Sequence, residues 1–392
     1  MKSWPIKRLE DIAEIYGGST PARDNPTFWD GEIPWVTPTD LPMPDDGISI
    51  INKTKDSITK TGLDNSSATV VPKSSVLFSS RATIGKVAVA DMPLATNQGF
   101  ANFIPHPEVN SRFLAYTLWF RRADIARLSG STTFKEVSRS TIRKYQIPLP
   151  PLAEQERIVK FLDEADELRK LRAQADRRTE ELIPAIFHEM FGDPELTLYP
   201  LKKLVELVLP DRPITYGILK PGVNVDDGVP YVRVLDIKQN RLHIRQLKRT
   251  SQRIANQYRR SILVPGDILI TIRGTVGRTC IVPEELTGAN ITQDTARLSL
   301  IPTIESSYII EYLNSPWAQH WMSRRMLGQA VKGINLGDLR QLPIPIPPLS
   351  IQNLFSKRLT DIRAAEAVQT ASRQRLDALF QSTLHRAFQG EL

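Results

Sequence analysis

The stretch IPLPPLAEQ at residues 147–155 returns as IPIPPLSIQ at residues 344–352, 197 positions later, and this repeat decides how the chain is organised. The register then holds without a gap, so that Ile158, for example, matches Phe355. Each copy ends a stretch of globular composition and opens a long stretch with helical periodicity. The repeat therefore predicts a duplicated chain in which a globule and a helix alternate twice.

Similar segments also occur in the two globular stretches, in the same order. LFSSRATIGKVAVA at residues 77–90 resembles LITIRGTVGRTCIV at 269–282, and IPWVTPTDL at 33–41 resembles VPYVRVLDI at 229–237. The offset between the copies drifts between 192 and 197 positions in the globules, whereas it is constant in the helical stretches. This contrast indicates variable loops in the globules and helices that tolerate no insertion.

The first helical stretch, residues 152–190, predicts one long helix. Phe161, Leu168, Ala175 and Leu182 recur every seven residues and form an apolar stripe, while Glu and Arg fill the other faces. A helix of about 39 residues is about 58 Å long at a rise of 1.5 Å per residue. Such a helix cannot bury its stripe alone.

The second helical stretch, about residues 350–388, carries a comparable apolar face that includes Leu359, Ile362 and Leu379. The expected arrangement is an antiparallel coiled coil of the two helices. Two independent helices, each packed on its own globule, are the alternative. The candidate residues for helix packing or partner docking are Gln155, Phe161, Leu162, Leu168, Leu182, Gln352, Leu359, Ile362 and Leu379.

The globular stretches predict a mixed, β-rich fold. Short apolar or alternating runs are broken by glycine, and Gly85 and Gly277 mark expected hairpin turns. A helix is expected near residues 111–129, with its counterpart near 306–326. The fold class is therefore α+β, with two β-rich globules separated by two long antiparallel helices and related by an internal pseudo-twofold axis.

Composition and charge narrow the class of protein further. The formal net charge of the 392 residues is +8, and residues 1–151 and 192–348 hold net +3 and +6 of it. A basic excess in the globules suits a polyanionic partner, although a merely basic globular protein would look the same. The single Cys280 excludes an internal disulfide, and the five histidines show no metal-ligand spacing. With no apolar run of about 18 residues and no signal peptide, a cytoplasmic protein is expected.

Catalytic signatures are missing. NPTF at residues 25–28 only weakly resembles the tetrapeptide of amino-methyltransferases, and no glycine-rich cofactor loop accompanies it. The sequence contains no Glu-x-Lys, and IGKV at 84–87 lacks the upstream glycine of a phosphate-binding loop. Any enzymatic activity is therefore expected to reside in partners, and no bound cofactor is expected in this chain.

These features together resemble the specificity subunit of type I restriction–modification enzymes. The doubled junctions and the helices after them carry the resemblance, with the opening WPIKRLEDI at 4–12, the GGSTP loop at 17–21 and the terminal AFQGEL. The resemblance implies a target-recognition domain at residues 1–146, a junction and spacer helix at 147–192, a second target-recognition domain at 193–343, and a second junction and helix at 344–392.

The resemblance also implies a function and partners. Each target-recognition domain would read one half of a bipartite, asymmetric double-stranded DNA site through the major groove, with the helices as spacer. Two modification subunits would bring S-adenosylmethionine and methylate adenine, and two restriction subunits would cleave DNA using ATP and Mg²⁺. A ruler of about 58 Å spans more than one DNA turn of about 34 Å.

Polar side chains of the loops and turns, most of them basic or amide, are the candidates for DNA contact, because Arg pairs with guanine and Asn or Gln with adenine. Ion pairing, packing and backbone capping are the alternatives for them, and the junction glutamines are expected to bind backbone or a partner subunit. The DNA-contact candidates are Thr20, Arg23, Arg81, Lys86, Asn97, Gln98 and Lys135 in the first globule, and Tyr216, Lys220, Arg273, Arg278, Gln293 and Lys332 in the second.

Two other functions remain as alternatives to a DNA-reading subunit. A non-catalytic coiled-coil adaptor with two protein-binding heads would show no salt-dependent affinity for DNA. A self-sufficient DNA methyltransferase conflicts with the missing cofactor motifs.

Overall fold

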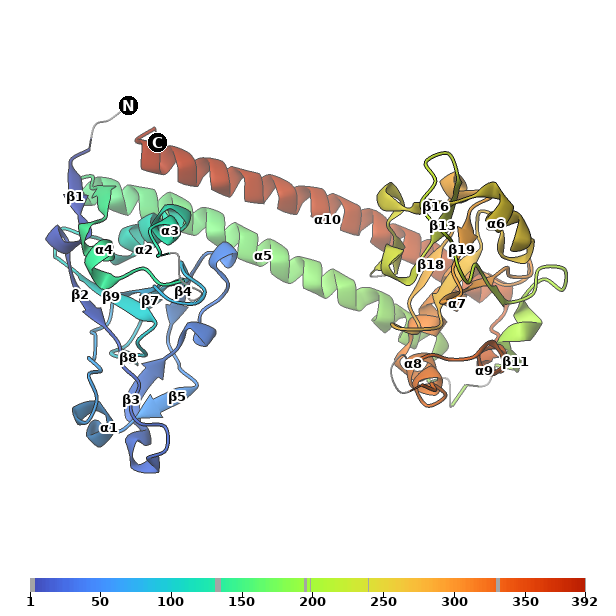
Figure 1. Ribbon diagram of the computed structural model, residues 1–392, viewed down its shortest axis with the longest axis horizontal. Coiled ribbons are helices and arrows are strands. Elements are labelled where there is room, and N and C mark those ends of the chain that lie inside the picture. The colour runs from blue at the N-terminus through green and yellow to red at the C-terminus, as the bar shows by residue number, and fades with distance from the viewer. Residues whose placement is uncertain are drawn as a thin grey trace. The chain divides into compact units, whose positions relative to one another are not determined.

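The computed structural model describes residues 4–130, 135–193, 196–197, 199–238, 240–328 and 332–391. Contacts divide the chain into two compact units. Unit 1 comprises Met1–Ala173 and Ala371–Leu392, and unit 2 comprises Gln174–Thr370. The two long helices, α5 (Leu152–Phe191) and α10 (Leu349–Gln389), each contribute one end to either unit (Figure 1). The helical bounds agree closely with the stretches predicted from the sequence.

Unit 1 contains a five-stranded sheet in the order β2-β9-β6-β7-β4, a three-stranded sheet in the order β5-β3-β8, and the short pair β1-β10. The strands are β1 (Ile6–Arg8), β2 (Ala13–Gly17), β3 (Trp29–Val36), β4 (Ile48–Ile51), β5 (Asp56–Ile58), β6 (Val76–Ser79), β7 (Val87–Ala90), β8 (Ala95–Thr96), β9 (Phe100–Pro105) and β10 (Gln146–Pro148). The short helices are α1 (Lys60–Asp64), α2 (Ser111–Phe120), α3 (Arg122–Arg127) and α4 (Arg139–Lys144).

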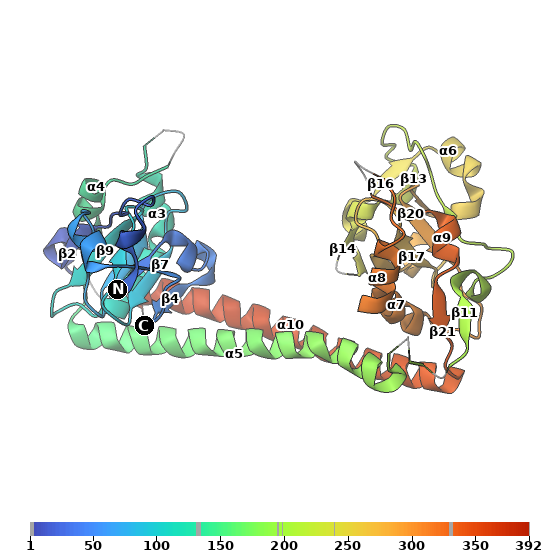
Figure 2. The same cartoon turned by 90° about the horizontal axis from the view of Figure 1, so that it is seen from below.

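Unit 2 contains a four-stranded sheet in the order β12-β20-β17-β18, a three-stranded sheet in the order β16-β13-β19, and the pairs β14-β15 and β11-β21. Figure 2 labels several of these strands, among them β13, β16, β17 and β20. The strands are β11 (Leu201–Lys203), β12 (Thr215–Tyr216), β13 (Val229–Val232), β14 (Ile237–Lys238), β15 (Arg241–Leu242), β16 (Lys248–Thr250), β17 (Ile268–Thr271), β18 (Thr279–Ile281), β19 (Asn290–Ile291), β20 (Thr295–Leu298) and β21 (Pro343–Pro345). The short helices are α6 (Gln252–Gln257), α7 (Ser306–Asn314), α8 (Pro316–Ser323) and α9 (Leu336–Arg340).

The strand orders of the two units correspond, which confirms the internal repeat. β2-β9-β6-β7 matches β12-β20-β17-β18, and β5-β3-β8 matches β16-β13-β19. The registers agree as well, since Trp35 pairs with Ala95 in unit 1 and Tyr231 with Asn290 in unit 2. Gly85 and Gly277 make the predicted turns between paired strands, with φ of +98° and +90°, where glycine is favoured. The sequence alignment of the globules is therefore a structural alignment.

The helix ends are part of the cores of the units. In unit 1, Ile158 and Leu162 of α5 are buried with Phe380 and Phe388 of α10 against α2. The rings of Phe113 and Phe388 lie 5.6 Å apart, and those of Trp119 and Phe380 lie 5.8 Å apart. The first turns of α5 thus pack beside the last turns of α10, which is the antiparallel arrangement that the sequence predicted.

Unit 2 repeats this arrangement with the opposite helix ends. Phe187 and Phe191 of α5 pack on Phe355 of α10, with ring centroids 5.5 and 5.3 Å from it. Tyr308 of α7 stacks on Phe187 at 5.8 Å, and Leu359 is buried in the same cluster. Both units therefore rest on aromatic side chains at the ends of the helices.

The predicted heptad stripe is wrong as the packed seam. Phe161, Leu168 and Leu182 are exposed to solvent by 44%, 50% and 45%. Leu379 is exposed and Ile362 half-buried, whereas Leu162 and Leu359 are buried as expected. The reason is that each helix end buries the face that packs against its unit. Between these ends, the two helices contact each other through polar side chains. Arg169 donates to Asp377 at 2.7 Å in unit 1, and Gln369 donates to Thr179 at 3.0 Å in unit 2.

The described part of the chain contains neither a candidate membrane-spanning helix nor a candidate metal site. No helix there combines the length and the apolarity that crossing a bilayer requires. The same residues contain no group of three or more His, Cys, Asp or Glu side chains arranged to hold a metal ion.

Candidate nucleic-acid interface

Two loops of unit 1 meet at one edge of its sheets. The loop after β2 joins β8 through Ser19 N–H, which donates to Thr96 O at 2.9 Å. The loop after β8 joins β3 through Asn97 N–H, which donates to Val36 O at 3.0 Å. A Cβ on Gly18 would lie 2.2 Å from Thr96 O, so only glycine permits this close approach. The predicted GGSTP loop is thereby fixed beside the two strand ends.

The hairpin between β6 and β7 adds a third loop to this edge, and the segment before α4 adds a fourth. Ser80 N–H donates to Gly99 O at 2.8 Å, and Ala82 N–H donates to Lys135 O at 3.2 Å. The side chains of Arg81 and Glu136 pair across the same junction, at 2.9 Å. Segments far apart in sequence are thus joined by backbone hydrogen bonds into one surface.

Unit 2 reproduces this framework with other side chains. Ile218 N–H donates to Ile291 O at 2.7 Å, Thr292 N–H to Val232 O at 3.0 Å, and Gly274 N–H to Lys332 O at 3.0 Å. These bonds match those of Ser19, Asn97 and Ala82 in unit 1. The loops surround a cavity of about 1110 Å³, whose lining includes Arg233, Arg273, Gln293 and Asn335. We define these matching surfaces as the loop edges of units 1 and 2.

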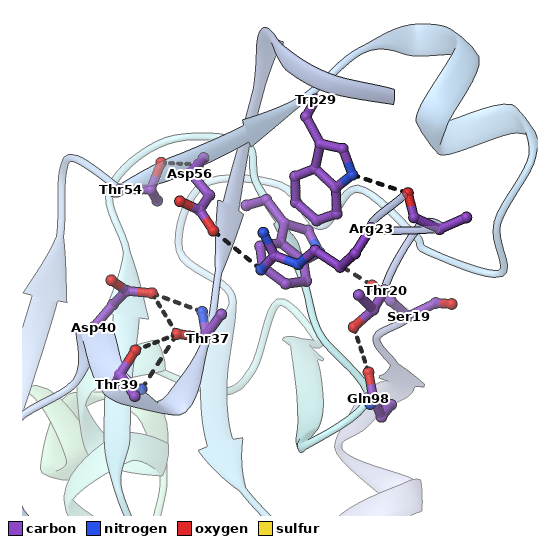
Figure 3. Close-up of polar contacts among 12 residues, drawn as sticks. Ser19, Thr20, Arg23, Trp29, Thr37, Thr39, Asp40, Thr54, Asp56 and Gln98 are labelled. Carbon is purple, nitrogen blue, oxygen red and sulfur yellow. Dashed lines mark hydrogen bonds and ion pairs between the residues drawn. The ribbon is translucent and has the colours of Figure 1, made fainter. Parts of the chain in front are cut away.

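Arg23 lies on an aromatic platform at the loop edge of unit 1 (Figure 3). Its guanidinium is 3.9 Å from the ring centroid of Trp29 and 4.9 Å from that of Trp35, and it donates to Asp56 at 3.1 Å. The indole N–H groups of Trp29 and Trp35 donate at 3.0 Å to the carbonyls of Ala22 and Ser19. The loop is therefore held rigidly, and Arg23 is oriented by cation–π contacts while its side chain stays exposed.

Several predicted residues are exposed at the loop edges. In unit 2, Arg273, Lys220, Tyr216 and Lys332 are exposed. Within the residues that the structure describes, none of these four side chains has an ion pair. In unit 1, Lys135 is exposed, but Arg23 and Arg81 already pair with carboxylates. The loop edge of unit 2 therefore offers more unpaired positive charge than that of unit 1.

The expectation that Lys86 presents its ammonium to DNA is wrong. Lys86 is 7% exposed, and its Nζ donates to the carbonyls of Pro38 at 2.7 Å and Leu41 at 2.9 Å. Arg278, its counterpart, is half-buried and donates to Ile237 O at 3.1 Å, the carbonyl that matches Leu41 O. Both side chains point inward, Lys86 to carbonyls of the loop after β3 and Arg278 to the carbonyl of the first residue of β14.

Replacing Lys86 with methionine should therefore affect stability rather than DNA binding. The change removes both hydrogen bonds and leaves two carbonyls without their donor, which costs about 2 kcal/mol in the free energy of unfolding. Urea unfolding of the full chain measures this loss. The salt dependence of DNA binding is expected to stay unchanged, and a lower salt slope with unchanged stability would contradict the assignment.

The amide candidates differ in their surroundings. Asn97 Oδ1 accepts from Gly99 N–H at 2.9 Å, so Asn97 is a backbone-capping amide, which was the alternative interpretation. Gln98 is exposed and accepts from the hydroxyl of Thr20 at 2.5 Å (Figure 3). Gln293 lines the cavity of unit 2. Two of the three amides therefore remain open toward the loop edges.

The junction glutamines bind backbone groups of their own units, which is one of the two roles expected for them. Gln155 is fully buried; its Oε1 accepts from Asn110 N–H at 2.8 Å, and its Nε2 donates to Glu108 O at 3.0 Å and Pro150 O at 2.9 Å. Gln352 accepts from Glu305 N–H at 2.9 Å and donates to Pro347 O at 2.8 Å. Since Asn110 and Glu305 precede α2 and α7, each glutamine ties a long helix to its unit.

Two aspartates that fix turns at the loop edges, Asp40 and Asp236, were not identified from the sequence. Asp40 accepts from Thr37 N–H at 2.7 Å, and Asp236 accepts from Arg233 N–H at 2.9 Å, so each carboxylate fixes the turn after β3 or β13. In unit 2 the carboxylate also holds the Arg233 guanidinium, at 2.7 and 2.9 Å. The signal was the aspartate shared by IPWVTPTDL and VPYVRVLDI.

Cys280, the single cysteine, lies in the core of unit 2. Burial raises the pKa of its thiol to about 12, so it is protonated at neutral pH. A protonated, buried thiol is a poor nucleophile and a poor metal ligand. Cys280 therefore contributes packing rather than chemistry.

Known proteins match this chain in both of its repeated halves. A family model described as the type I restriction modification DNA specificity domain matches residues 1–177 and 218–377. The EcoBI specificity subunit of Escherichia coli is 28% identical over an alignment 427 positions long. This alignment covers 99% of this chain and 80% of that protein. The MjaIX specificity subunit of Methanocaldococcus jannaschii is 36% identical over 194 residues, 49% of this chain. That match spans only 44% of the length of the MjaIX subunit.

Solved structures share the fold. A chain from a study of assembly and conformational transition of a type I restriction–modification system has a TM-score of 0.67 at 20% identity, with 100% of this chain and 99% of that chain covered. The S subunit from M. genitalium has a TM-score of 0.54 at 16% identity, with 98% and 96% covered. Two family matches, in the two halves that repeat one framework, show that the chain belongs to the family of type I restriction–modification DNA specificity subunits.

Proposed function

We propose that this chain reads a bipartite, asymmetric DNA site, with one half-site bound by the loop edge of each unit. The observation that carries the proposal is that both loop edges share one backbone framework but carry different side chains. Thr37 in unit 1 corresponds to Arg233 in unit 2, within matching turns that are fixed by Asp40 and Asp236. A common framework supports the same way of approaching DNA, and different side chains support different base preferences.

The proposal assigns the other tasks of the complex to partners. The chain itself is non-catalytic and binds no cofactor; modification subunits bring S-adenosylmethionine for adenine methylation, and restriction subunits bring ATP and Mg²⁺. The constant offset of 197 residues between the helices supports their role as spacer and docking surface, because insertions there would change the distance between half-sites. The proposed place of action is the cytoplasm, where the chromosome of a prokaryotic cell lies.

Methylome sequencing of the host tests this function. Cells with the chain should carry methylated adenines in one motif of two specified half-sites separated by unspecified bases. Deletion of the gene should remove that methylation, and a plasmid copy should restore it. Methylation that persists after deletion, or that loses a continuous motif instead, would overturn the proposal.

Salt dependence tests the uneven charge of the two loop edges. Replacing Arg273 with glutamine is expected to lower the slope of log affinity against log salt concentration by about 0.9, the value for one phosphate contact. Arg81→Gln is the matched control, because Arg81 is already paired with Glu136 at 2.9 Å and should change the slope less. Titration of specific duplex DNA at several salt concentrations measures both slopes. Equal slopes for the two variants would contradict the uneven charge distribution.

The non-catalytic adaptor with protein-binding heads remains the alternative function. It predicts that the purified chain has no salt-dependent affinity for duplex DNA, so the same titration decides between the two functions.

A further inference from the structure

Gln98 and Gln293 occupy the same position in the two loop edges. Each is the second residue after a short parallel strand, β8 or β19. The residue before each glutamine donates its N–H to the matching strand, Asn97 to Val36 O and Thr292 to Val232 O, both at 3.0 Å. The two units therefore present the same amide side chain from the same place.

The neighbours of these glutamines differ. Because Ser19 matches Ile218 by its hydrogen bond to the strand, the next residues, Thr20 and Leu219, also match. In unit 1, the Thr20 hydroxyl donates to Gln98 Oε1 at 2.5 Å and turns the amide oxygen toward the loop. In unit 2, Leu219 cannot form this bond, and it is 49% exposed.

The amide of Gln293 is therefore open at both of its polar atoms. Its side chain has no hydrogen bond within the described ranges, while its backbone N–H is fixed by Ile218 O at 3.0 Å. The residue lines the cavity of unit 2 together with Leu219, Lys238 and Arg273. A fixed backbone with an unengaged amide is the arrangement expected of a side chain that binds a partner.

Base chemistry identifies that partner. An amide that offers oxygen and nitrogen together matches the N6 donor and N7 acceptor of adenine in the major groove, and an apolar side chain contacts the methyl group of the paired thymine. We infer that Gln293, with Leu219 beside it, reads an A·T base pair in the half-site of unit 2. This inference rests on the proposed function and adds the residues and the base pair.

Cationic residues around the same cavity support this assignment. Lys238 and Arg273 carry no ion pair within the residues described, so both remain available for phosphates. Phosphate contacts position a protein on DNA, whereas base contacts specify the sequence. Gln293 is thus framed by the charges that would bring a base edge into its reach.

The corresponding glutamine of unit 1, Gln98, is expected to prefer a different base from Gln293. With its oxygen held by Thr20, Gln98 presents mainly its N–H groups, which suit an acceptor such as guanine O6 or N7. The pair of positions Thr20 and Leu219 would then set the base preference of otherwise equal glutamines.

Binding-site selection from random duplex DNA tests the inference, with the full chain assembled with its modification subunits. The wild-type complex should select two half-sites. Gln293→Leu should reduce the preference for one A·T pair, in one half-site only, by about tenfold. Gln293→Glu should shift the preference at that position toward cytosine, since a carboxylate accepts from cytosine N4.

Exchange of the neighbouring residues gives the matched controls. Leu219→Thr should weaken the same A·T preference with Gln293 intact, and Thr20→Leu should move one position in the other half-site toward A·T. In every variant, the half-site of the unmutated unit reports whether the complex has assembled and binds DNA. Lys220→Ala, at an exposed cation, should weaken binding at all positions alike.

The outcomes separate this inference from the proposed function. An unchanged selected sequence in the Gln293 variants, beside two intact half-sites, would overturn the inference and leave the proposed function standing. Equal weakening of every position by Gln293→Leu would overturn it as well. Absence of any half-site for the wild-type complex would overturn the proposed function itself.

Discussion

Replacing Phe355 with alanine is expected to lower the free energy of unfolding of unit 2 by about 3–5 kcal/mol. The ring is 1% exposed and lies 5.5 and 5.3 Å from Phe187 and Phe191, so its loss leaves a cavity where α5 and α10 meet. Hydrogen–deuterium exchange mass spectrometry of the full chain measures the effect on unit 2 and on unit 1 separately.

The neighbouring residue provides the control for Phe355. Leu354 precedes it on α10 and is 49% exposed, so Leu354→Ala should change the free energy of unfolding by about 0.5 kcal/mol or less. Equal losses of protection in the two variants would show that α10 does not pack through the face that carries Phe355.

Replacing Gln155 with leucine is expected to lower the free energy of unfolding of unit 1 by about 3 kcal/mol. The side chain is fully buried and serves Asn110 N–H and the carbonyls of Glu108 and Pro150, all of which would lose their partner. Because these groups join the start of α5 to the start of α2, exchange should increase there first.

Gln174→Leu is the matched control, as it makes the same change on the same helix at an exposed position. It should leave both exchange and unfolding nearly unchanged. A Gln155 variant as stable as this control would mean that the junction motif does not join the helix to its unit. Gln352→Leu should repeat the loss in unit 2, where Glu305 N–H and Pro347 O lose their partner.

The sequence predicted the organisation of the fold because its repeat is long and its helix signals are strong. The doubled junction located both long helices, and Gly85 and Gly277 marked turns that require positive φ. The face through which the helices pack was harder to predict from the sequence. Periodicity counts apolar positions, and Leu168 and Leu182 satisfy it while remaining exposed. Which face is buried depends on the surface that each unit offers, as for Ile158 and Phe191.

The candidate site was predictable in its location and only partly in its residues. The repeated segments placed the loops correctly, since matching segments make matching backbone hydrogen bonds. The direction of a basic side chain depends on distant groups, and Lys86 turns inward because the carbonyls of Pro38 and Leu41 accept hydrogen bonds from its ammonium. The pairing of Arg81 with Glu136 likewise requires contact between segments 55 residues apart.

Footprinting of the assembled complex on its DNA site tests the central claim most directly, because it reports whether the two loop edges read separate half-sites. The account predicts two protected blocks of different sequence, separated by bases that can be changed without loss of binding. Exchange of residues 1–146 for the corresponding segment of another family member should alter one block only. A single continuous block, or alteration of both blocks by this exchange, would contradict it.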